Sequence, residues 1–296
     1  MHFDNQVYRP PQEAWTPLLQ VTHGCSYDRC TYCSMYDQNP FRVSDWEEVV
    51  ADIGELAAKN RPYQRLYLVN GDPFFLSTER LLRIIEEVQR QIPTVETFSM
   101  YASIRNISAK SDEELKELRS RGINQLYIGI ESFFDEALDF VNKGYTGKEA
   151  LTQLKRLEEA GIQHSSGIML GLLGAGRGEE TGRINGEFFK ELKPKEVWLM
   201  STTVMPGTQL AAQRDSGEYV ETSEYERVEE IHAFLEAAQM EHRTYFNSIH
   251  PTNAFQLEGY LPEDRERLLA ECEFALNSFE PDSFQRTFDR KNVTRL

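Results

Sequence analysis

Residues 65–101 read RLYLVNGDPFFLSTERLLRIIEEVQRQIPTVETFSMY, an apolar run, a polar turn, an amphipathic segment and a second strand-like run. The run at residues 65–69 is almost uniformly apolar, as expected of a strand that is covered on both faces of a parallel sheet. The same alternation recurs, with further strand-like runs at residues 18–22, 125–130, 167–172 and 196–201. Repeated strand and helix segments predict an α/β fold with a parallel sheet.

Helix starts and ends support this alternation. Ser-x-x-Glu sequences that can form capping boxes begin at Ser44, Ser111 and Ser223, and a capping box marks the first turn of a helix. Gly122 and Gly161 stand where helices should end before a strand.

The expected architecture is a partial or closed parallel (β/α)6 TIM-like barrel in residues 1–215, with a helical or mixed C-terminal extension packed on it in residues 216–296. In such folds the chemistry gathers at the carboxyl ends of the strands. Polar or glycine-rich residues that follow each strand are therefore the candidates for a functional site.

The amino-acid composition limits the kinds of protein that this chain can be. The 296 residues carry a net charge of −16, with 40% hydrophobic and 27% charged residues, which is ordinary for a globular protein. No apolar stretch is long enough to span a membrane, and the polar N-terminus does not resemble a secretory signal, so we expect a cytoplasmic protein with no membrane partner. The acidic balance disfavours nucleic acid and favours a small-molecule substrate.

Three of the four cysteines form a compact group. Cys25, Cys30 and Cys33 have the spacing C-x4-C-x2-C directly after the first strand-like run, whereas Cys272 is far away, on the apolar stripe of a predicted helix, and is expected to be a core thiol. Thiolates suit iron–sulfur clusters and zinc. Three thiolates would leave one iron of a cubic cluster open to a chelating ligand, while a fourth ligand from His23 would instead make a closed Cys3His zinc site.

The cysteine loop resembles that of the radical S-adenosylmethionine (SAM) superfamily. That family carries three cysteines after its first barrel strand, usually as C-x3-C-x2-C, with an aromatic residue before the third, as Tyr32 is here. This chain has one additional residue between Cys25 and Cys30. The resemblance implies an oxygen-sensitive four-iron, four-sulfur (4Fe–4S) cluster on the three cysteines, with SAM as the second cofactor and Tyr32 beside it.

Two further strand ends fit the resemblance. In the family, a Gly-Gly-Glu-like segment after the second strand binds the amino group of the methionine part of SAM, which would make Gly71 and Asp72 cofactor-binding residues. After the third strand, Ser103 and Arg105 would bind the methionine carboxylate. The alternatives are a simple Gly-Asp-Pro turn and a surface arginine that pairs with a neighbouring acid.

The fourth and fifth strands carry the last cofactor-site candidates. Residues 127–132 read Tyr-Ile-Gly-Ile-Glu-Ser, with Asn-Lys-Gly at residues 142–144, and resemble radical families related to coproporphyrinogen oxidase and tRNA methylthiotransferases. By that resemblance Glu131 is a catalytic residue in the cofactor or substrate pocket, although it could also cap the next helix. Leu170 would flank the adenine through its backbone, or simply belong to a buried strand.

The resemblance implies an enzyme that reductively cleaves SAM to a 5′-deoxyadenosyl radical, which removes hydrogen from a substrate. A reductant such as flavodoxin or ferredoxin would be its protein partner. His250 could line the substrate side or be structural. Two rival functions stay open: an iron–sulfur electron-transfer or sensor protein, and a zinc-stabilised binding protein.

Overall fold

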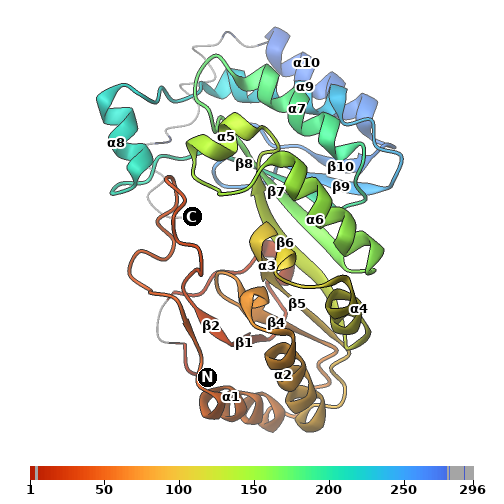
Figure 1. Cartoon of the computed structure of the whole chain (residues 1–296). Coiled ribbons are helices and arrows are strands. Elements are labelled where there is room, and N and C mark those ends of the chain that lie inside the picture. The colour runs from red at the N-terminus through yellow and green to blue at the C-terminus, as the bar shows by residue number, and fades with distance from the viewer. Residues whose placement is uncertain (4–5, 279, 281–289, 291–296) are drawn as a thin grey trace. The chain divides into compact units, whose positions relative to one another are not determined.

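The computed structural model describes residues 1–3, 6–278, 280 and 290 (Figure 1). They form two compact units: the first contains residues 1–28, 35–128 and 153–164, and the second contains residues 29–34, 129–152 and the described residues from 165 onward. The end of the predicted C-terminal extension, residues 279, 281–289 and 291–296, lies outside the described residues.

The first unit is built on parallel strands. β1 pairs with β4, β4 with β5, and β5 with β6, all in parallel, with one irregularity in the last register at Phe98 and Ser99. β2 and β3 form a separate antiparallel pair. The strands are β1 (Leu18–Gln20), β2 (Thr22–His23), β3 (Arg42–Val43), β4 (Arg65–Val69), β5 (Thr97–Ala102) and β6 (Ile123–Glu131), of which the last runs into the second unit.

Helices connect these strands, as the sequence predicts. They are η1 (Pro11–Glu13), α1 (Trp46–Ala58), η2 (Pro73–Phe75), α2 (Thr78–Gln91), α3 (Ile104–Ser108) and α4 (Asp112–Ser120). The predicted capping box of Ser111 forms: its amide donates to Glu114 at 2.8 Å, and its hydroxyl accepts from the Glu114 amide at 3.2 Å. The box predicted at Ser44 is wrong by one residue, because Asp45 is the N-cap of α1 and pairs with Glu48.

The second unit continues the α/β pattern. β7 pairs with β8 and β8 with β9 in parallel, and β10 is added antiparallel to β9. Helices α7, α9 and α10 pack in one layer (Figure 1). The elements are α5 (Asp135–Phe140), α6 (Gly147–Glu159), β7 (Gln163–Leu170), α7 (Gly178–Phe189), β8 (Glu196–Ser201), α8 (Gln209–Ser216), α9 (Glu224–Ala237), β9 (Thr244–Asn247), β10 (Glu258–Leu261) and α10 (Arg265–Ser278), of which α6 and β7 also extend into the first unit.

A buried acid marks the interior of the first unit. Glu13 is 2% exposed and accepts hydrogen bonds from Arg65 at 2.7 Å, Ser99 at 2.7 Å and Tyr127 at 2.8 Å. Burial would raise the pKa of Glu13, but the hydrogen bonds from Arg65 and its other partners outweigh burial and lower the pKa. The carboxylate therefore stays ionised and ties β4, β5 and β6 together.

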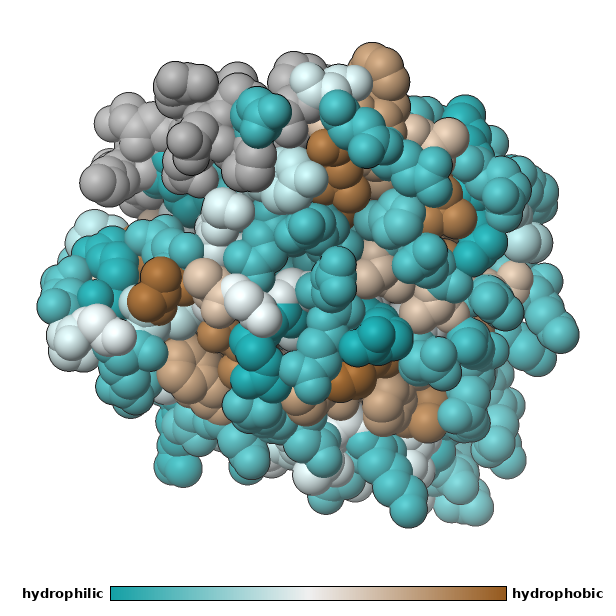
Figure 2. Space-filling view, turned by 90° about the horizontal axis from the view of Figure 1, so that it is seen from above, coloured by the Kyte–Doolittle hydropathy of each residue, from teal (hydrophilic) through white to brown (hydrophobic). Residues whose placement is uncertain are grey.

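The surface is largely hydrophilic, as expected of a chain with 27% charged residues. The face drawn in Figure 2 is mostly hydrophilic, with scattered hydrophobic side chains. Among the described residues, no helix combines the length and apolar character needed to cross a lipid bilayer.

Candidate functional site

Close backbone packing positions the start of the cysteine loop. Gly24 follows β2 in the left-handed region (φ 61°), and its carbonyl accepts from the Gly71 amide at 3.2 Å. A Cβ on Gly71 would lie 2.3 Å from that carbonyl oxygen, closer than atoms can approach. Gly71 thus lets the turn after β4 lie directly against the residue before Cys25.

Asp72 fastens the same loop. Its carboxylate is 2% exposed, and it accepts hydrogen bonds from the Ser26 amide at 3.0 Å, from the Ser26 hydroxyl, and from the Asn106 side chain at 3.4 Å. Burial raises the pKa of Asp72, and these hydrogen bonds oppose the rise. The predicted cofactor-binding acid therefore also holds the residue that follows Cys25.

Ser103 and Arg105 lie where β5 passes into α3. The Ser103 hydroxyl caps α3 by accepting from the Asn106 amide at 3.2 Å. Arg105 is exposed, and its guanidinium carbon lies 4.6 Å from the ring centroid of Tyr27, in the cysteine loop. Within the described part of the chain, its guanidinium makes no hydrogen bond or ion pair, and its contact is with the face of this ring.

Residues 29–34 belong to the second unit. The Thr31 amide donates to Val141 at 3.2 Å, and the Thr31 carbonyl accepts from Leu210 at 2.9 Å. Tyr32 packs against two apolar clusters, one around Met169 and one around Tyr219. Burial, followed by the charge of Glu131, raises the pKa of Tyr32 well above its usual range, so the phenol stays protonated.

Glu131 ends β6 in a strained conformation, with a φ of 70° and 6% exposure. Its carboxylate pairs with Lys143 at 3.1 Å, and the same ammonium donates to the Gly129 carbonyl at 3.0 Å. Burial alone would lower the pKa of Lys143, but Glu131, followed by Tyr145, Tyr32 and Cys30, raises it, so the lysine is a permanent cation. Lys143 therefore links Glu131 electrostatically to the cysteine loop.

Lys143 and Tyr145 have no role that their sequence pattern alone predicts. Tyr145 donates to the Ile130 carbonyl at 3.1 Å, beside Glu131. The Asn-Lys-Gly-Tyr segment is visible in the sequence as a possible site motif. The acid that pairs with the lysine cannot be predicted from it, because the pairing depends on how α5 (Asp135–Phe140) reverses the chain direction.

Leu170 is buried at the end of β7, and its carbonyl accepts from the Thr202 amide at 2.9 Å. Gly171 follows with a φ of 71° and donates to Glu230 at 2.7 Å. The strand end is thus packed tightly against α9.

The contacts of His250 and Cys272 indicate structural roles for both residues. Burial lowers the pKa of His250 to about 4, and the ring bonds Thr252 at 2.7 Å and contacts Trp198 edge-on. Cys272 is fully buried in α10, so the prediction of a core thiol is confirmed.

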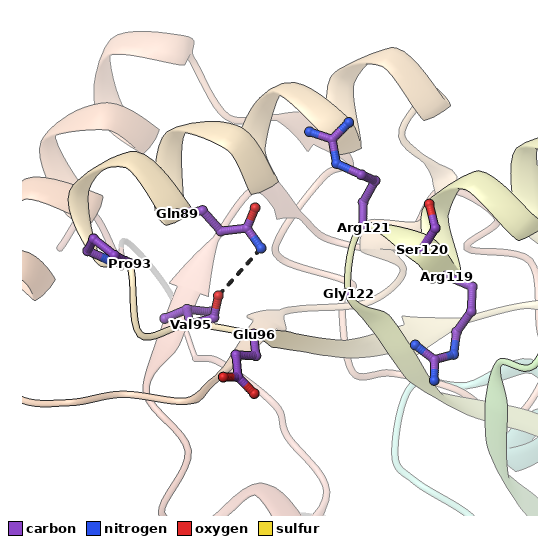
Figure 3. A pocket seen from close by; sticks show the side chains of 8 residues that line it. All are labelled: Gln89, Pro93, Val95, Glu96, Arg119, Ser120, Arg121 and Gly122. Atoms are coloured by element: carbon purple, nitrogen blue, oxygen red, sulfur yellow. Dashed lines mark hydrogen bonds between the residues drawn. The ribbon is translucent and has the colours of Figure 1, made fainter.

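A cavity of about 430 Å³ lies elsewhere in the first unit (Figure 3). It is lined by residues at the amino ends of β5 and β6, among them Glu96, Arg119 and Gly122. Because chemistry in parallel α/β folds gathers at the opposite, carboxyl ends, this cavity is not the candidate site.

Cys25, Cys30 and Cys33 are each half-buried. Cys25 belongs to the first unit, whereas Cys30 and Cys33 belong to the second, where the Cys33 amide donates to the Cys30 carbonyl at 3.2 Å. Soft thiolates on a firmly anchored, partly exposed loop have the donor chemistry that an iron–sulfur cluster needs.

Comparison with known proteins gives a family match. The family model described as the Radical SAM superfamily matches residues 19–180, over half of the chain. The heme chaperone HemW of Bacillus subtilis (strain 168) is 28% identical over 124 residues, which are 41% of this chain and 33% of that protein. The uncharacterized methyltransferase PH0819 of Pyrococcus horikoshii is 24% identical over 195 residues, 65% of this chain and 40% of that protein. The chain thus spans only part of the length of the curated relatives that it matches.

Two solved structures show the likeness of fold. Methylornithine synthase (PylB) is similar with a TM-score of 0.53 at 16% identity, over 92% of this chain and 85% of that one. Coproporphyrinogen III oxidase (HemN) from Escherichia coli is similar with a TM-score of 0.50 at 18% identity, over 67% and 46% of the two chains. The predicted parallel α/β class is confirmed.

Proposed function

Since this chain belongs to the radical SAM superfamily, whose members are enzymes that use a 4Fe–4S cluster and SAM, we propose that it cleaves SAM reductively and acts on a small-molecule substrate. The observation that carries the proposal is the extent of the match, because residues 19–180 include the three cysteines and the candidate residues after four strands. When bound, the reduced cluster supplies an electron for breaking a carbon–sulfur bond of SAM, which yields methionine and a 5′-deoxyadenosyl radical that removes hydrogen from the substrate.

Cys25, Cys30 and Cys33 would hold the cluster. The anchoring of this loop supports the assignment: Gly24 and Asp72 hold the residues around Cys25, and Val141 and Leu210 hold Thr31. Each of these contacts restrains the backbone beside a cysteine within its own unit, which lowers the entropy cost of metal ligation.

The methionine end of SAM would be bound by residues of the first unit. The exposed guanidinium of Arg105 would bind the carboxylate, with Ser103 nearby, while Gly71 and Asp72 would approach the amino group. Because the hydrogen bonds of Asp72 are already directed at Ser26 and Asn106, its contribution to SAM binding would be as a buried negative charge and as the fastener of the loop.

Glu131 would act on the ribose or the substrate, with Lys143 holding its carboxylate in place. The permanent positive charge of Lys143 keeps Glu131 oriented as an acceptor. Tyr32 and Leu170 would shape the apolar wall that excludes water around SAM. A flavodoxin-like or ferredoxin-like reductant would supply the electron.

The test is anaerobic purification, iron analysis, and incubation with dithionite and SAM. We expect an iron-loaded protein that forms 5′-deoxyadenosine, and a Cys25/Cys30/Cys33→Ala variant with neither iron nor product. An iron-loaded protein that forms no 5′-deoxyadenosine would favour the electron-transfer or sensor function. A colourless protein with zinc on the three cysteines would favour the zinc-stabilised binding protein.

A further inference from the structure

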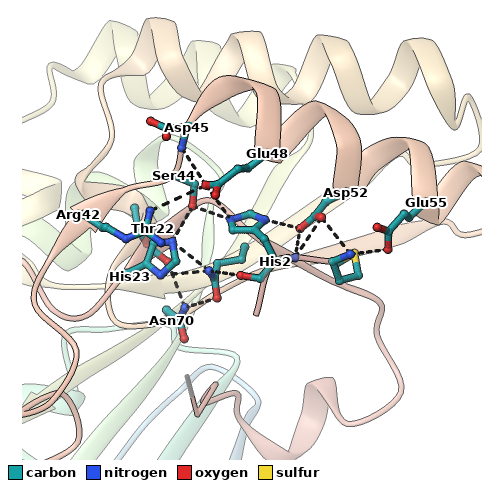
Figure 4. A network of polar contacts seen from close by, with 12 residues as sticks. His2, Thr22, His23, Arg42, Ser44, Asp45, Glu48, Asp52, Glu55 and Asn70 are labelled. Carbon is teal, nitrogen blue, oxygen red and sulfur yellow. Dashed lines mark hydrogen bonds and ion pairs between the residues drawn. The ribbon is translucent and has the colours of Figure 1, made fainter. Parts of the chain in front are cut away.

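A second group of metal-binding side chains lies in the first unit, apart from the three cysteines. His2, His23 and Glu48 each offer a ligand atom, and these atoms all lie within 4.8 Å of one another (Figure 4). The three residues come from the N-terminal segment, from β2 and from α1, so only the fold brings them together. His23 is fully buried, and His2 and Glu48 are half-buried.

The distances suit a small tetrahedral ion. His2 Nε2 lies 3.7 Å from a Glu48 oxygen. The Ser44 hydroxyl lies 3.1 Å from His2 Nε2 and 3.2 Å from His23 Nε2. Four ligands at zinc bond lengths of about 2.0–2.1 Å stand roughly 3.3 Å from one another. The separation between His2 and Glu48, and the two separations to Ser44, scatter around that value, so Ser44 stands where a fourth ligand or a water would be. The Gln20 amide nitrogen, 3.0 Å from His23 Nε2, would have to turn away from an ion at this place.

A carboxylate behind His2 orients the ring. Nδ1 of His2 lies 2.6 Å from Asp52, which is almost completely buried. When Nδ1 donates to Asp52, Nε2 of the neutral ring carries its lone pair toward Ser44 and Glu48. A carboxylate that binds the remote nitrogen of an imidazole is the usual support of a zinc-ligating histidine.

We propose that His2, His23 and Glu48 bind a zinc ion, with Asp52 as the positioning residue behind His2. Two imidazoles and one carboxylate are a donor set that zinc accepts. The ion would clamp the N-terminal segment and α1 onto β2, whose last residue lies two positions before Cys25. This site is separate from the proposed cluster and does not depend on SAM cleavage.

The competing explanation is a network of hydrogen bonds without an ion. The Gln20 amide can donate to His23, since its nitrogen lies 3.0 Å from Nε2 and 3.1 Å from Nδ1. The single Ser44 proton can satisfy one imidazole, and a protonated Nε2 on the other ring can donate to Ser44. Arg42, 3.8 Å from Glu48, could neutralise the carboxylate in place of an ion. The two explanations differ in whether the folded protein retains zinc.

The test uses the anaerobically purified 296-residue chain without an N-terminal tag. After incubation with zinc and gel filtration, we expect about one zinc ion per chain in the wild type, in the exposed-surface control His242→Gln, and in the Cys25/Cys30/Cys33→Ala variant. His2→Gln should lose the zinc, and Asp52→Asn should bind it about 10–100-fold more weakly.

Cobalt provides a readout on the folded protein. Cobalt added to the cysteine variant should give the intense visible absorption of a tetrahedral ion without thiolate charge-transfer bands, and His2→Gln should abolish it while far-ultraviolet circular dichroism stays unchanged. A wild type that retains no zinc would overturn the proposal. So would zinc that disappears in the cysteine variant but persists in His2→Gln, because the ion would then sit on the thiolates.

Discussion

At the scale of single residues, the pair Glu131 and Lys143 carries the largest electrostatic consequence. Both side chains are almost fully buried, and each is the charged partner of the other. A buried charge that loses its partner costs far more than the intact pair contributes, because the remaining ion keeps its desolvation penalty.

We therefore expect Lys143→Met to destabilise the protein by about 3–5 kcal/mol, measured by urea unfolding. Adding Glu131→Gln should restore most of that loss, since no uncompensated charge is then buried. A single variant as stable as the wild type would mean that Glu131 is solvated, contrary to its burial.

A second residue-scale prediction concerns pH. Burial raises the pKa of Glu230 to about 8, against an ordinary value of 4.5, so the folded protein holds a proton there that the unfolded chain has released. Unfolding then releases this proton, so between about pH 5 and pH 8 the contribution of Glu230 makes stability fall as the pH rises.

Glu230→Gln should make that fall shallower, because the amide oxygen can still accept from Gly171 and has no proton to lose. Urea unfolding of both proteins at the two ends of this pH range measures the difference. Parallel pH profiles for wild type and variant would contradict the raised pKa.

At the scale of elements, the turn after β4 and the cysteine loop are held together by two glycines. Gly71→Ala would drive its Cβ into the Gly24 carbonyl, 2.3 Å away, and backbone on both sides must move to relieve the overlap. We expect this variant to retain clearly less iron after anaerobic reconstitution than the wild type.

Gly54→Ala is the matched control, since Gly54 lies inside α1 and its added Cβ would come no closer than 3.6 Å to Gln91. It should retain iron fully and gain about 0.5–1 kcal/mol of stability from the better helix former. Equal iron retention in the two alanine variants would argue against a role for Gly71 in placing the loop.

Element boundaries show what can be predicted from sequence. β4 and β8 begin and end where their apolar runs do. The predicted strand at residues 18–22 was too long, because the chain turns after Gln20 to pair Thr22 and His23 with β3, a contact between distant segments. The Ser223 cap forms, but Glu226 accepts from Gly176 and Gly178 instead of closing the box.

The candidate site also has a part that can be predicted from sequence and a part that cannot. The cysteine spacing and the residues after each strand could be located from sequence, because local patterns carry them. The link from Asp72 to Ser26 and Asn106, and the meeting of His2, His23 and Glu48, could not, because each joins segments whose contact depends on the completed fold.

At the scale of the whole molecule, net charge bears on the substrate. With 48 acidic and 32 basic side chains, the chain carries a net charge of −16 and should repel phosphate backbones. We predict no shift of single-stranded RNA in a gel-mobility assay even at low salt. Salt-sensitive binding of RNA would contradict the small-molecule part of the proposal.

One spectroscopic measurement tests both the family assignment and the proposed open iron of the cluster. Electron paramagnetic resonance of the anaerobically reduced protein, recorded with and without SAM, reports directly on whether SAM coordinates the cluster. We expect a 4Fe–4S signal whose g-values change on adding SAM and that is absent from the Cys25/Cys30/Cys33→Ala variant. A reduced cluster whose spectrum is indifferent to SAM would contradict it.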